Sequence, residues 1–336
     1  MTIHIALGKE SYDVTVERGA LSRAGEIFDL DRRALVVTDD GVPKQYAEAV
    51  AARCKEAHIV TVKAGEGSKS AETYLDLLDR MVEAGFERTD CVVAVGGGVV
   101  GDLAGFVAAS YMRGVDFYNV PTTLLSMVDS SIGGKTAINF GGIKNIVGAF
   151  WQPKAVLIDP DVLKTLPARQ ISNGLAEAIK MAATFDRDLF GLIERGNAAE
   201  NIEKIIVGSL DIKRRVVEAD SREAGLRRVL NFGHTIGHGI EAERRGALYH
   251  GECVALGMLP MCSSGVRARL SAVLEKNGLP TLFNGDRNAV VEALTHDKKA
   301  SGGMITVVTV DEIGEFAMIK ETPSELLGRM TAVWGE

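Results

Sequence analysis

The sequence contains few cysteines, and they do not have the spacing of a disulfide framework or a thiolate metal site. Four cysteines occur in 336 residues, and none form a CxxC motif. This usage fits a reducing compartment. The first seven residues lack the basic region and long apolar run of a signal peptide, and no stretch approaches the roughly 18 to 20 apolar residues that span a bilayer. We therefore expect a cytoplasmic protein with no membrane partner.

An excess of basic residues is also missing. The chain has 38 Lys and Arg residues against 45 Asp and Glu residues, a net charge of -7. A protein whose main partner is nucleic acid usually carries a basic excess or a basic stripe. We therefore expect no nucleic-acid partner, and an anionic substrate would have to meet local groups of basic side chains.

The first part of the chain alternates short β-branched runs with helical stretches. The length allows two domains, and a composition of 46% hydrophobic and 25% charged residues is that of a folded globular protein. A hairpin is expected over 2–7 and 11–17, and further strands over 34–38, 59–62, 91–95, 115–120 and 155–158. This pattern predicts an α/β fold whose N-terminal domain has a Rossmann-like parallel sheet with helices on both faces.

Beyond residue 160 the pattern is mainly α-helical. Apolar residues recur three and four positions apart, as in amphipathic helices, over 171–196, 199–220, 229–243, 250–270 and 287–295. A late hairpin is expected for 304–310 and 315–319. The expected domains are residues 1–160 and a mainly helical domain of residues 161–336. The cleft between two such domains is the usual small-molecule site.

A glycine-rich turn follows the strand expected at 91–95. In Gly96-Gly97-Gly98-Val99-Val100-Gly101-Asp102 the glycines would let the backbone approach a pyrophosphate at the start of a helix. The acidic residue that a dinucleotide-binding fingerprint carries about 20 positions later is missing. The motif therefore predicts a phosphate-binding turn outside the common Rossmann layout, and a plain tight turn remains the alternative.

Three of the six histidines, His234, His238 and His250, lie within seventeen residues. His234 and His238 are four positions apart, a spacing that puts both rings on one helical face and can bind zinc. Glu177 is the best candidate for a third ligand, because its carboxylate lies on an otherwise apolar helix face and needs a partner. Spacing alone leaves open whether His234 pairs with His238 or with His250, and whether these histidines bind a metal at all.

Together these motifs resemble the superfamily that contains the dehydroquinate synthases and the iron-type alcohol and glycerol dehydrogenases. Within it, the blocks at 121–126, 129–139, 144–145, 174–180, 231–241 and 249–252 resemble the dehydroquinate synthases. The iron-type dehydrogenases lack the Gly133-Gly134-Lys135-Thr136 block, and the inosose and valiolone synthases usually alter the residues around Asp102 and Asp129. Another sugar-phosphate cyclase, an iron-type polyol dehydrogenase and a non-catalytic NAD sensor are the alternatives.

This resemblance implies two cofactors, NAD and one divalent metal ion, zinc or cobalt. The implied metal ligands are Glu177, His234 and His250, which leaves His238 to face the substrate. The implied NAD-binding residues are Asp39, Glu66, Lys69, Gly97, Gly98, Val99, Gly101, Asp102, Thr122, Thr123, Lys135, Lys144, Leu163 and Thr165.

The resemblance also implies a sugar-acid phosphate substrate, 3-deoxy-D-arabino-heptulosonate 7-phosphate. The family's reaction combines transient oxidation, β-elimination of phosphate, re-reduction and aldol closure. The implied substrate contacts are Asp129 and Lys180 for hydroxyls, Lys213 and Arg227 for the carboxylate, and Lys135, Asn145, Asn231, His238 and Lys298 for the phosphate. In the family, the residue at the position of Arg113 reaches the neighbouring subunit's phosphate site, so a homodimer is expected.

Overall fold

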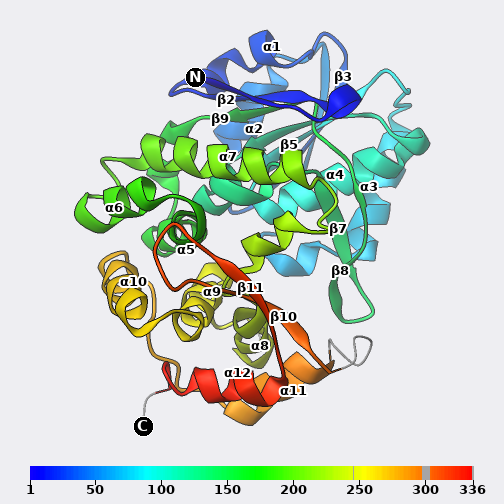
Figure 1. The fold of residues 1–336 in the computed structure, drawn as a ribbon. Coiled ribbons are helices and arrows are strands. Elements are labelled where there is room, and N and C mark those ends of the chain that lie inside the picture. The colour runs from blue at the N-terminus through cyan, green and yellow to red at the C-terminus, as the bar shows by residue number, and fades with distance from the viewer. Residues whose placement is uncertain (245, 297–302, 335–336) are drawn as a thin grey trace. The chain divides into compact units, whose positions relative to one another are not determined.

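The computed structural model describes the whole chain except residues 245, 297–302 and 335–336. It contains two compact units, unit 1 (Met1–Pro167) and unit 2 (Ala168–Glu336), whose elements are labelled in Figure 1. Among the described residues, no helix combines the length and apolar character needed to cross a membrane.

Unit 1 is built on a seven-stranded sheet with the strand order β1-β2-β9-β6-β5-β3-β4. Neighbouring strands are parallel except β1 and β2, which form the expected N-terminal hairpin. The strands are β1 (Thr2–Ile5), β2 (Tyr12–Val16), β3 (Arg33–Asp39), β4 (Glu56–Val62), β5 (Cys91–Gly96), β6 (Asp116–Pro121) and β9 (Ala155–Ile158). The predicted Rossmann-like parallel sheet is confirmed.

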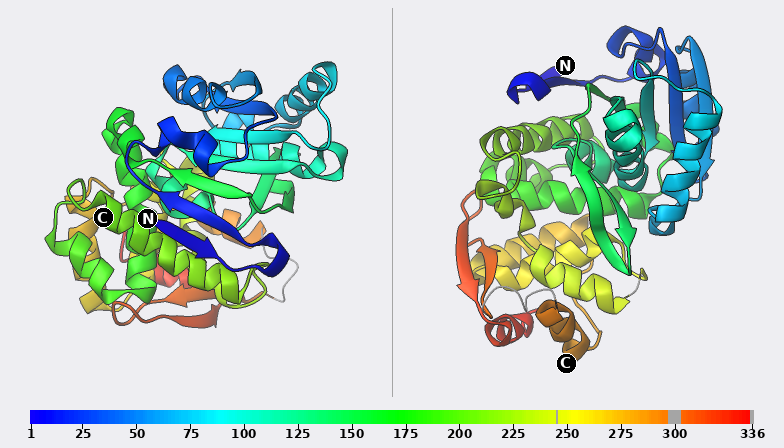
Figure 2. Two further views of the ribbon diagram at one scale, coloured as in Figure 1. Left: turned by 90° about the horizontal axis from the view of Figure 1, so that it is seen from above. Right: turned by 90° about the vertical axis from the view of Figure 1, so that its right-hand side faces the viewer.

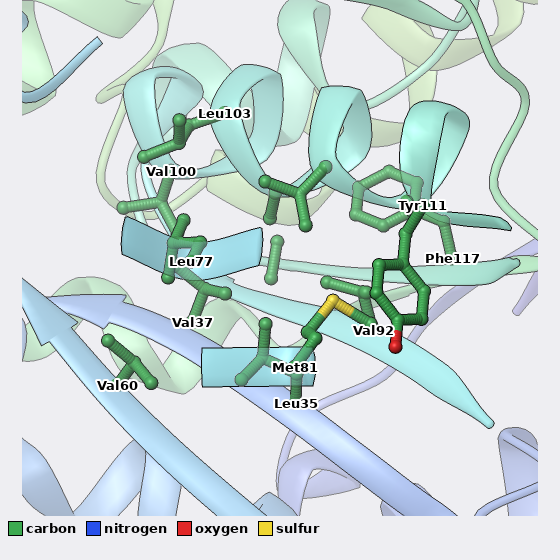
Figure 3. Close-up of a cluster of buried hydrophobic side chains, with 14 of the residues drawn as sticks. Leu35, Val37, Val60, Leu77, Met81, Val92, Val100, Leu103, Tyr111 and Phe117 are labelled. Atoms are coloured by element: carbon green, nitrogen blue, oxygen red, sulfur yellow. The ribbon is translucent and has the colours of Figure 1, made fainter. Parts of the chain in front are cut away.

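The helices between the strands cover both faces of this sheet. Figure 3 shows the buried cluster in which α3 (Ala71–Glu83) and α4 (Gly98–Ser110) pack on β3, β4 and β5, with Leu77 and Val100 among its residues. Because parallel crossovers are right-handed, α2 (Lys44–Ala51) lies on the opposite face. A short helix, α1 (Ala24–Ile27), precedes β3.

The strand order reverses direction between β3 and β5. The chain runs from β3 outward to β4, then returns past β3 to β5 and continues to β6 on the other side. In open parallel sheets, ligands bind beyond the carboxyl ends of the strands at this reversal. Asp39 ends β3 and Gly96 ends β5, so both lie at that point.

The sequence did not predict a second hairpin in unit 1, formed by β7 (Lys135–Phe140) and β8 (Ile143–Phe150). This ribbon is a separate two-stranded sheet, drawn as two long green arrows in Figure 2. Gly141 and Gly142 connect the strands with φ of 60° and 79°. Positive φ at both loop residues is what a two-residue type I′ turn requires, and glycine meets it without strain. Two β-prone runs around Gly-Gly were the available signal.

Unit 2 is mainly helical and ends with the expected late hairpin of β10 (Ile305–Thr309) and β11 (Ala317–Glu321). Its helices are α5 (Ala168–Phe185), α6 (Arg187–Arg195), α7 (Ile202–Ala219), α8 (His234–Arg244), α9 (His250–Met258), α10 (Ser264–Lys276), α11 (Arg287–His296) and α12 (Pro323–Met330). Helix α12 was not predicted.

Three predicted helices of unit 2 were wrong in extent. The stretch 171–196 is two helices, because the Asp186 side chain accepts from the backbone of Asp188 and Leu189 and caps a new helix. The stretch 250–270 is interrupted at Leu259–Met261, and Ser263 caps α10. The stretch 229–243 begins within the 3-10 helix Leu226–Asn231, and α8 starts only at His234.

Candidate functional site

In unit 1 the glycine turn forms the junction between β5 and α4. Gly97 precedes the first residue of α4 and has no side chain to cap the helix, so the first N–H groups are available to an anion. A Cβ at Gly98 would lie 2.9 Å from Ser130 Oγ, and one at Gly101 would lie 3.2 Å from the Asn119 amide. Both glycines therefore let the start of α4 pack more closely against Ser130 and Asn119 than a residue with a Cβ could.

The Gly65-Glu66 turn and the glycine turn are joined through Lys69. The buried Lys69 ammonium lies 2.7 Å from Asp102 Oδ2 and 3.7 Å from Glu66 Oε1. Asn139 of β7 donates through its side chain to Glu66 Oε1 at 2.8 Å. Two motifs more than 30 residues apart thus form one charged cluster, in which Lys69 is held between two carboxylates.

The other predicted NAD-binding residues of unit 1 lie on several elements, and Thr122 and Thr123 contact the glycine turn. The Thr122 N–H donates to Gly96 O at 2.9 Å, and Thr123 Cγ2 lies 3.0 Å from where a Gly97 Cβ would be. Asp39 accepts from the Gly41 N–H at 2.8 Å, and burial raises the pKa of its carboxyl. Val99 lies in the first turn of α4, Leu163 and Thr165 lie in the 3-10 helix Pro160–Thr165, and the Thr165 hydroxyl is bonded to Tyr46.

Four predicted substrate or nucleotide residues lie on or near the β7–β8 ribbon. Lys135 begins β7, and Lys144 and Asn145 lie on β8, all three exposed. The Asn145 N–H donates to Asn139 Oδ1 at 2.9 Å, which connects the ribbon to the Lys69 cluster. Asp129 lies in the π-helical turn Ser126–Ser130 that precedes the ribbon.

The remaining predicted residue of unit 1, Arg113, lies on an exposed tip after α4. Met112, Arg113 and Gly114 have φ of 48°, 70° and 120°, a left-handed run that turns the chain toward β6. Arg113 therefore projects from the surface of this unit, away from the sheet's core.

In unit 2, three histidines and Glu177 form one compact cluster. Ligand atoms of His234, His238 and His250 all lie within 4.8 Å of one another. His234 Nε2 and His250 Nε2 lie 3.7 and 3.5 Å from the same oxygen of Glu177, which is fully buried on α5. Lys180, one turn along α5, forms an ion pair with the other oxygen. Helices α5, α8 and α9 thus bring the predicted metal ligands together, with His238 beside them.

The pKa shifts in the cluster follow from burial and from the charges that its members exert on one another. Burial disfavours the Glu177 carboxylate, but Lys180, His234 and His250 outweigh it and hold the Glu177 pKa well below its usual range. Burial, together with Lys180, holds the pKa of His234 well below its usual range, so this imidazole is neutral. Burial opposes charge on His250, yet Glu177 and Glu241 raise its pKa to about 9. A divalent cation suits such a site.

In His234 and His250, the ring nitrogen Nδ1, which does not face Glu177, lies close to a hydrogen-bond acceptor. His234 Nδ1 lies 3.2 Å from Phe232 O, and His250 Nδ1 lies 3.2 Å from Glu241 Oε2. An acceptor at Nδ1 fixes the tautomer that leaves the Nε2 lone pair for a metal. The role of Glu241 was not predicted from the sequence, although Glu241 lies three positions after His238 and seven after His234, on the same side of α8.

We expect Glu241→Gln to weaken divalent-metal affinity by about 10- to 100-fold, the scale measured for partners of metal-bound histidines. The glutamine amide oxygen can still accept a hydrogen bond from His250 Nδ1. Leucine has no acceptor, so Glu241→Leu should weaken metal affinity more than Glu241→Gln does. Competition with a chromophoric chelator measures the metal affinity of each variant without an activity assay. Glu243→Gln is the matched control, because Glu243 is equally buried on α8 but faces Arg244. Equal affinities for Glu241→Gln and Glu243→Gln would contradict the assignment.

Three of the predicted basic residues of unit 2 are almost completely buried: Lys180, Lys213 and Arg227. Among them, Lys180 contacts the cluster directly, through Glu177. A cavity of about 700 Å³ is lined by Asn231, His234 and His238, among other residues. This volume is in the range of small-molecule sites. Lys298 lies outside the described residues.

The predicted residues therefore form two sets, one in each unit. Unit 1 contains the predicted nucleotide residues with Arg113, Asp129, Lys135 and Asn145, and unit 2 contains the predicted metal ligands with the buried cations. Neither unit alone contains both sets.

Comparisons with known proteins match the whole chain. The family model described as 3-dehydroquinate synthase N-terminal matches residues 59–173, and the one described as 3-dehydroquinate synthase C-terminal matches residues 174–300. A 3-dehydroquinate synthase of Enterococcus faecalis is 44% identical over 97% of this chain and 97% of its own. One of Pelobacter propionicus is 40% identical over 96% and 97%.

Solved structures agree with these matches. The 2-epi-5-epi-valiolone synthase of Streptomyces hygroscopicus, with NAD+ and Zn2+ bound, superposes with a TM-score of 0.88 at 30% identity and covers 98% of both chains. A 2-deoxy-scyllo-inosose synthase complexed with carbaglucose-6-phosphate, NAD+ and Co2+ also has a TM-score of 0.88, covering 98% of this chain and 99% of its own. At 24% identity, the latter shows a shared fold.

Proposed function

Since the chain belongs to the 3-dehydroquinate synthase family, we propose that it releases phosphate from 3-deoxy-D-arabino-heptulosonate 7-phosphate and forms 3-dehydroquinate with the residues described above. The activity is that of a carbon–oxygen lyase acting on phosphates, and it serves the shikimate pathway. Its cofactors are NAD and one divalent metal ion, zinc or cobalt.

One observation carries the assignment of the site: His234 and His250 both direct Nε2 at the buried carboxylate of Glu177. Lys180 pairs with Oε2 of Glu177, while Oε1 faces both imidazoles, so Oε1 is the oxygen oriented as a metal ligand. Two imidazoles and one carboxylate suit zinc or cobalt and leave coordination positions for substrate oxygens. When bound, the metal supplies a Lewis acid, and NAD supplies a reversible oxidation of the substrate hydroxyl.

The chain's own residues bind and orient the substrate around this centre. Lys180 and Asp129 orient hydroxyls, while Lys213 and Arg227 bind the carboxylate. The phosphate is bound by Lys135, Asn145, Asn231, His238 and Lys298. The burial of the unit 2 cations supports this proposal, because charges in a low-dielectric interior act more strongly on an anionic ligand than exposed charges do.

The nucleotide is bound by unit 1. The uncapped start of α4, which follows the glycine turn, fits a pyrophosphate. The pair Lys69–Asp102 stiffens the adjoining turn. Asp39, at the end of the neighbouring strand β3, lies where a ribose would follow the pyrophosphate.

The active assembly is a homodimer in which Arg113 of each subunit completes the partner's phosphate site. The exposed, left-handed tip that carries Arg113 supports this proposal, because such a side chain can reach a second subunit. Mixing Arg113→Ala subunits with subunits inactive through Glu177→Gln should restore part of the activity. No recovery in verified mixed dimers would contradict a shared site.

The test of the proposed function is phosphate release with NAD present only in catalytic amounts. We expect many turnovers per NAD and no net NADH in the steady state, because the oxidised substrate remains bound and is reduced again before product leaves. Chelation should stop the reaction, and zinc or cobalt should restore it. Stoichiometric accumulation of free NADH at 340 nm, or full activity in metal-free protein, would contradict this function.

A further inference from the structure

A single carboxylate organises the turn between α7 and the 3-10 helix Leu226–Asn231. Asp220, the residue after α7, accepts three backbone N–H groups, from Ala224 at 2.9 Å, Gly225 at 2.7 Å and Arg227 at 3.0 Å. The backbone bonds from Arg227 and Gly225 hold the pKa of Asp220 below its usual range, so the carboxylate stays ionised near neutral pH. Because residues 222 and 224–226 are exposed, burial contributes little to the shape of this turn.

The turn directly contacts two residues of the proposed substrate site. The buried Arg227 side chain donates through Nη1 to the carbonyl of Ser221 at 2.7 Å. Glu223 has a φ of 60°, an uncommon conformation for this residue type, and its carboxylate accepts from Asn231 Nδ2 at 3.0 Å. The turn also lines the cavity of about 700 Å³ through Arg222 and Glu223. Through Ser221 O and Glu223, the turn therefore supplies one hydrogen bond that orients each of the Arg227 and Asn231 side chains.

We propose that Asp220 is a positioning residue, which holds Arg227 and Asn231 in their substrate-binding orientations by fixing this turn. The proposal rests on the proposed function of Arg227 and Asn231 as contacts of an anionic sugar-acid phosphate. Without the Asp220 carboxylate, the turn and both side chains would sample several conformations before substrate binds. Substrate binding would then have to order them, which weakens affinity. The metal ligands and the nucleotide turn make no contact with Asp220 through these bonds, so their functions should persist.

The experiment compares Asp220→Ala with Asp186→Ala in the complete, metal- and NAD-loaded enzyme. Asp186 is a matched control, since its carboxylate accepts the backbone N–H groups of Asp188 and Leu189 in the same unit but caps α6. For Asp220→Ala we expect the KM for the heptulosonate phosphate to rise about 10-fold, the scale for ordering two long side chains. We expect kcat, metal content and NAD affinity to stay close to wild type. Asp186→Ala should lower Tm without changing KM.

Two further variants show whether the effect passes through Arg227. Asp220→Asn keeps one acceptor oxygen and should recover part of the lost affinity. In an Arg227→Ala background, Asp220→Ala should add much less to KM than it does alone, because contacting residues are not additive.

The outcomes separate the inference from the function on which it rests. If Arg227→Ala raises KM but Asp220→Ala changes only Tm, as Asp186→Ala does, the positioning role is wrong and the substrate role of Arg227 stands. Fully additive effects in the double variant would also overturn the positioning role. If Arg227→Ala leaves KM unchanged, the proposed function of Arg227 is wrong, and the inference fails with it.

Discussion

His250→Ala is expected to lose both the bound divalent metal and turnover, whereas His238→Ala should keep the metal and lose turnover. His250 Nε2 lies 3.5 Å from Glu177 Oε1, and its Nδ1 is held by Glu241, so this ring has the orientation of a ligand. Removing a ligand should weaken metal binding by more than the roughly 100-fold that loss of an outer partner costs. In the proposed function His238 binds the substrate phosphate, so its loss should lower kcat/KM by roughly 10- to 150-fold, the equivalent of one charge-assisted hydrogen bond.

Metal analysis after gel filtration measures the first effect, and phosphate release in excess zinc or cobalt measures the second. His4→Ala is the control, because His4 also contacts a carboxylate, that of Asp13 at 2.7 Å, but on the exposed N-terminal hairpin of unit 1. It should change neither metal content nor turnover. The three imidazoles lie within 4.8 Å of one another, so the pairing of His234 with His238 is a concrete rival. Loss of metal in His238→Ala, with metal retained in His250→Ala, would show that His234 and His238 are the ligand pair.

The parallel sheet of unit 1 could be predicted because its strands are buried and therefore strongly apolar. Every residue of β5 and β9 is buried, and such continuous apolar runs are visible without a structure. Strand β8 is different, since almost all its residues are exposed. Its apolar residues Ile143, Ile146, Val147 and Phe150 do not alternate with polar residues as in a half-buried strand, and the β7–β8 ribbon was missed for that reason.

The helix boundaries of unit 2 depend on single polar side chains, which the spacing of apolar residues does not reveal. Apolar spacing continues through Asp186, and only its capping bonds separate α5 from α6. For the site, spacing predicted a histidine cluster and the apolar helix face around Glu177 predicted its carboxylate, while the choice between His238 and His250 depended on the resemblance. Glu241 and Asp220 were missed because their importance lies in contacts, with His250 and with a backbone turn, that local sequence does not reveal.

Gly257→Ala is expected to abolish metal binding and to destabilise unit 2, although residue 257 is no metal ligand. A Cβ on Gly257 of α9 would lie 2.0 Å from Gly233 O and 2.7 Å from Gly237 N. Both are backbone atoms, so no side chain can rotate away. Gly233 directly precedes His234, the first residue of α8, and His250 begins α9. The contact between these glycines therefore sets the distance between two proposed ligands.

The physical reason for the effect is that a metal site tolerates little displacement. Its ligands must stay within about 0.5 Å of their productive positions, and relief of a 2.0 Å contact requires α8 and α9 to separate by more than that. Overpacking of an interior costs about 1–3 kcal/mol even where side chains can yield. Here the backbone must move, so we expect the upper end of that range. Thermal unfolding and chelator competition on the purified protein measure both effects.

Gly265→Ala is the matched control, because a Cβ at this helical position of α10 meets nothing within 4 Å. It should leave metal affinity unchanged and stabilise the protein by up to about 1 kcal/mol, the helix preference of alanine over glycine. Unfolding temperatures measured after a chelator has removed the metal distinguish overpacking in Gly257→Ala from the loss of a ligand in His250→Ala. Without metal, Gly257→Ala should still unfold at a lower temperature than wild type, whereas His250→Ala, which leaves the helix contact intact, should not. Wild-type metal affinity and Tm in Gly257→Ala would show that the close approach of α8 and α9 does not set the metal site.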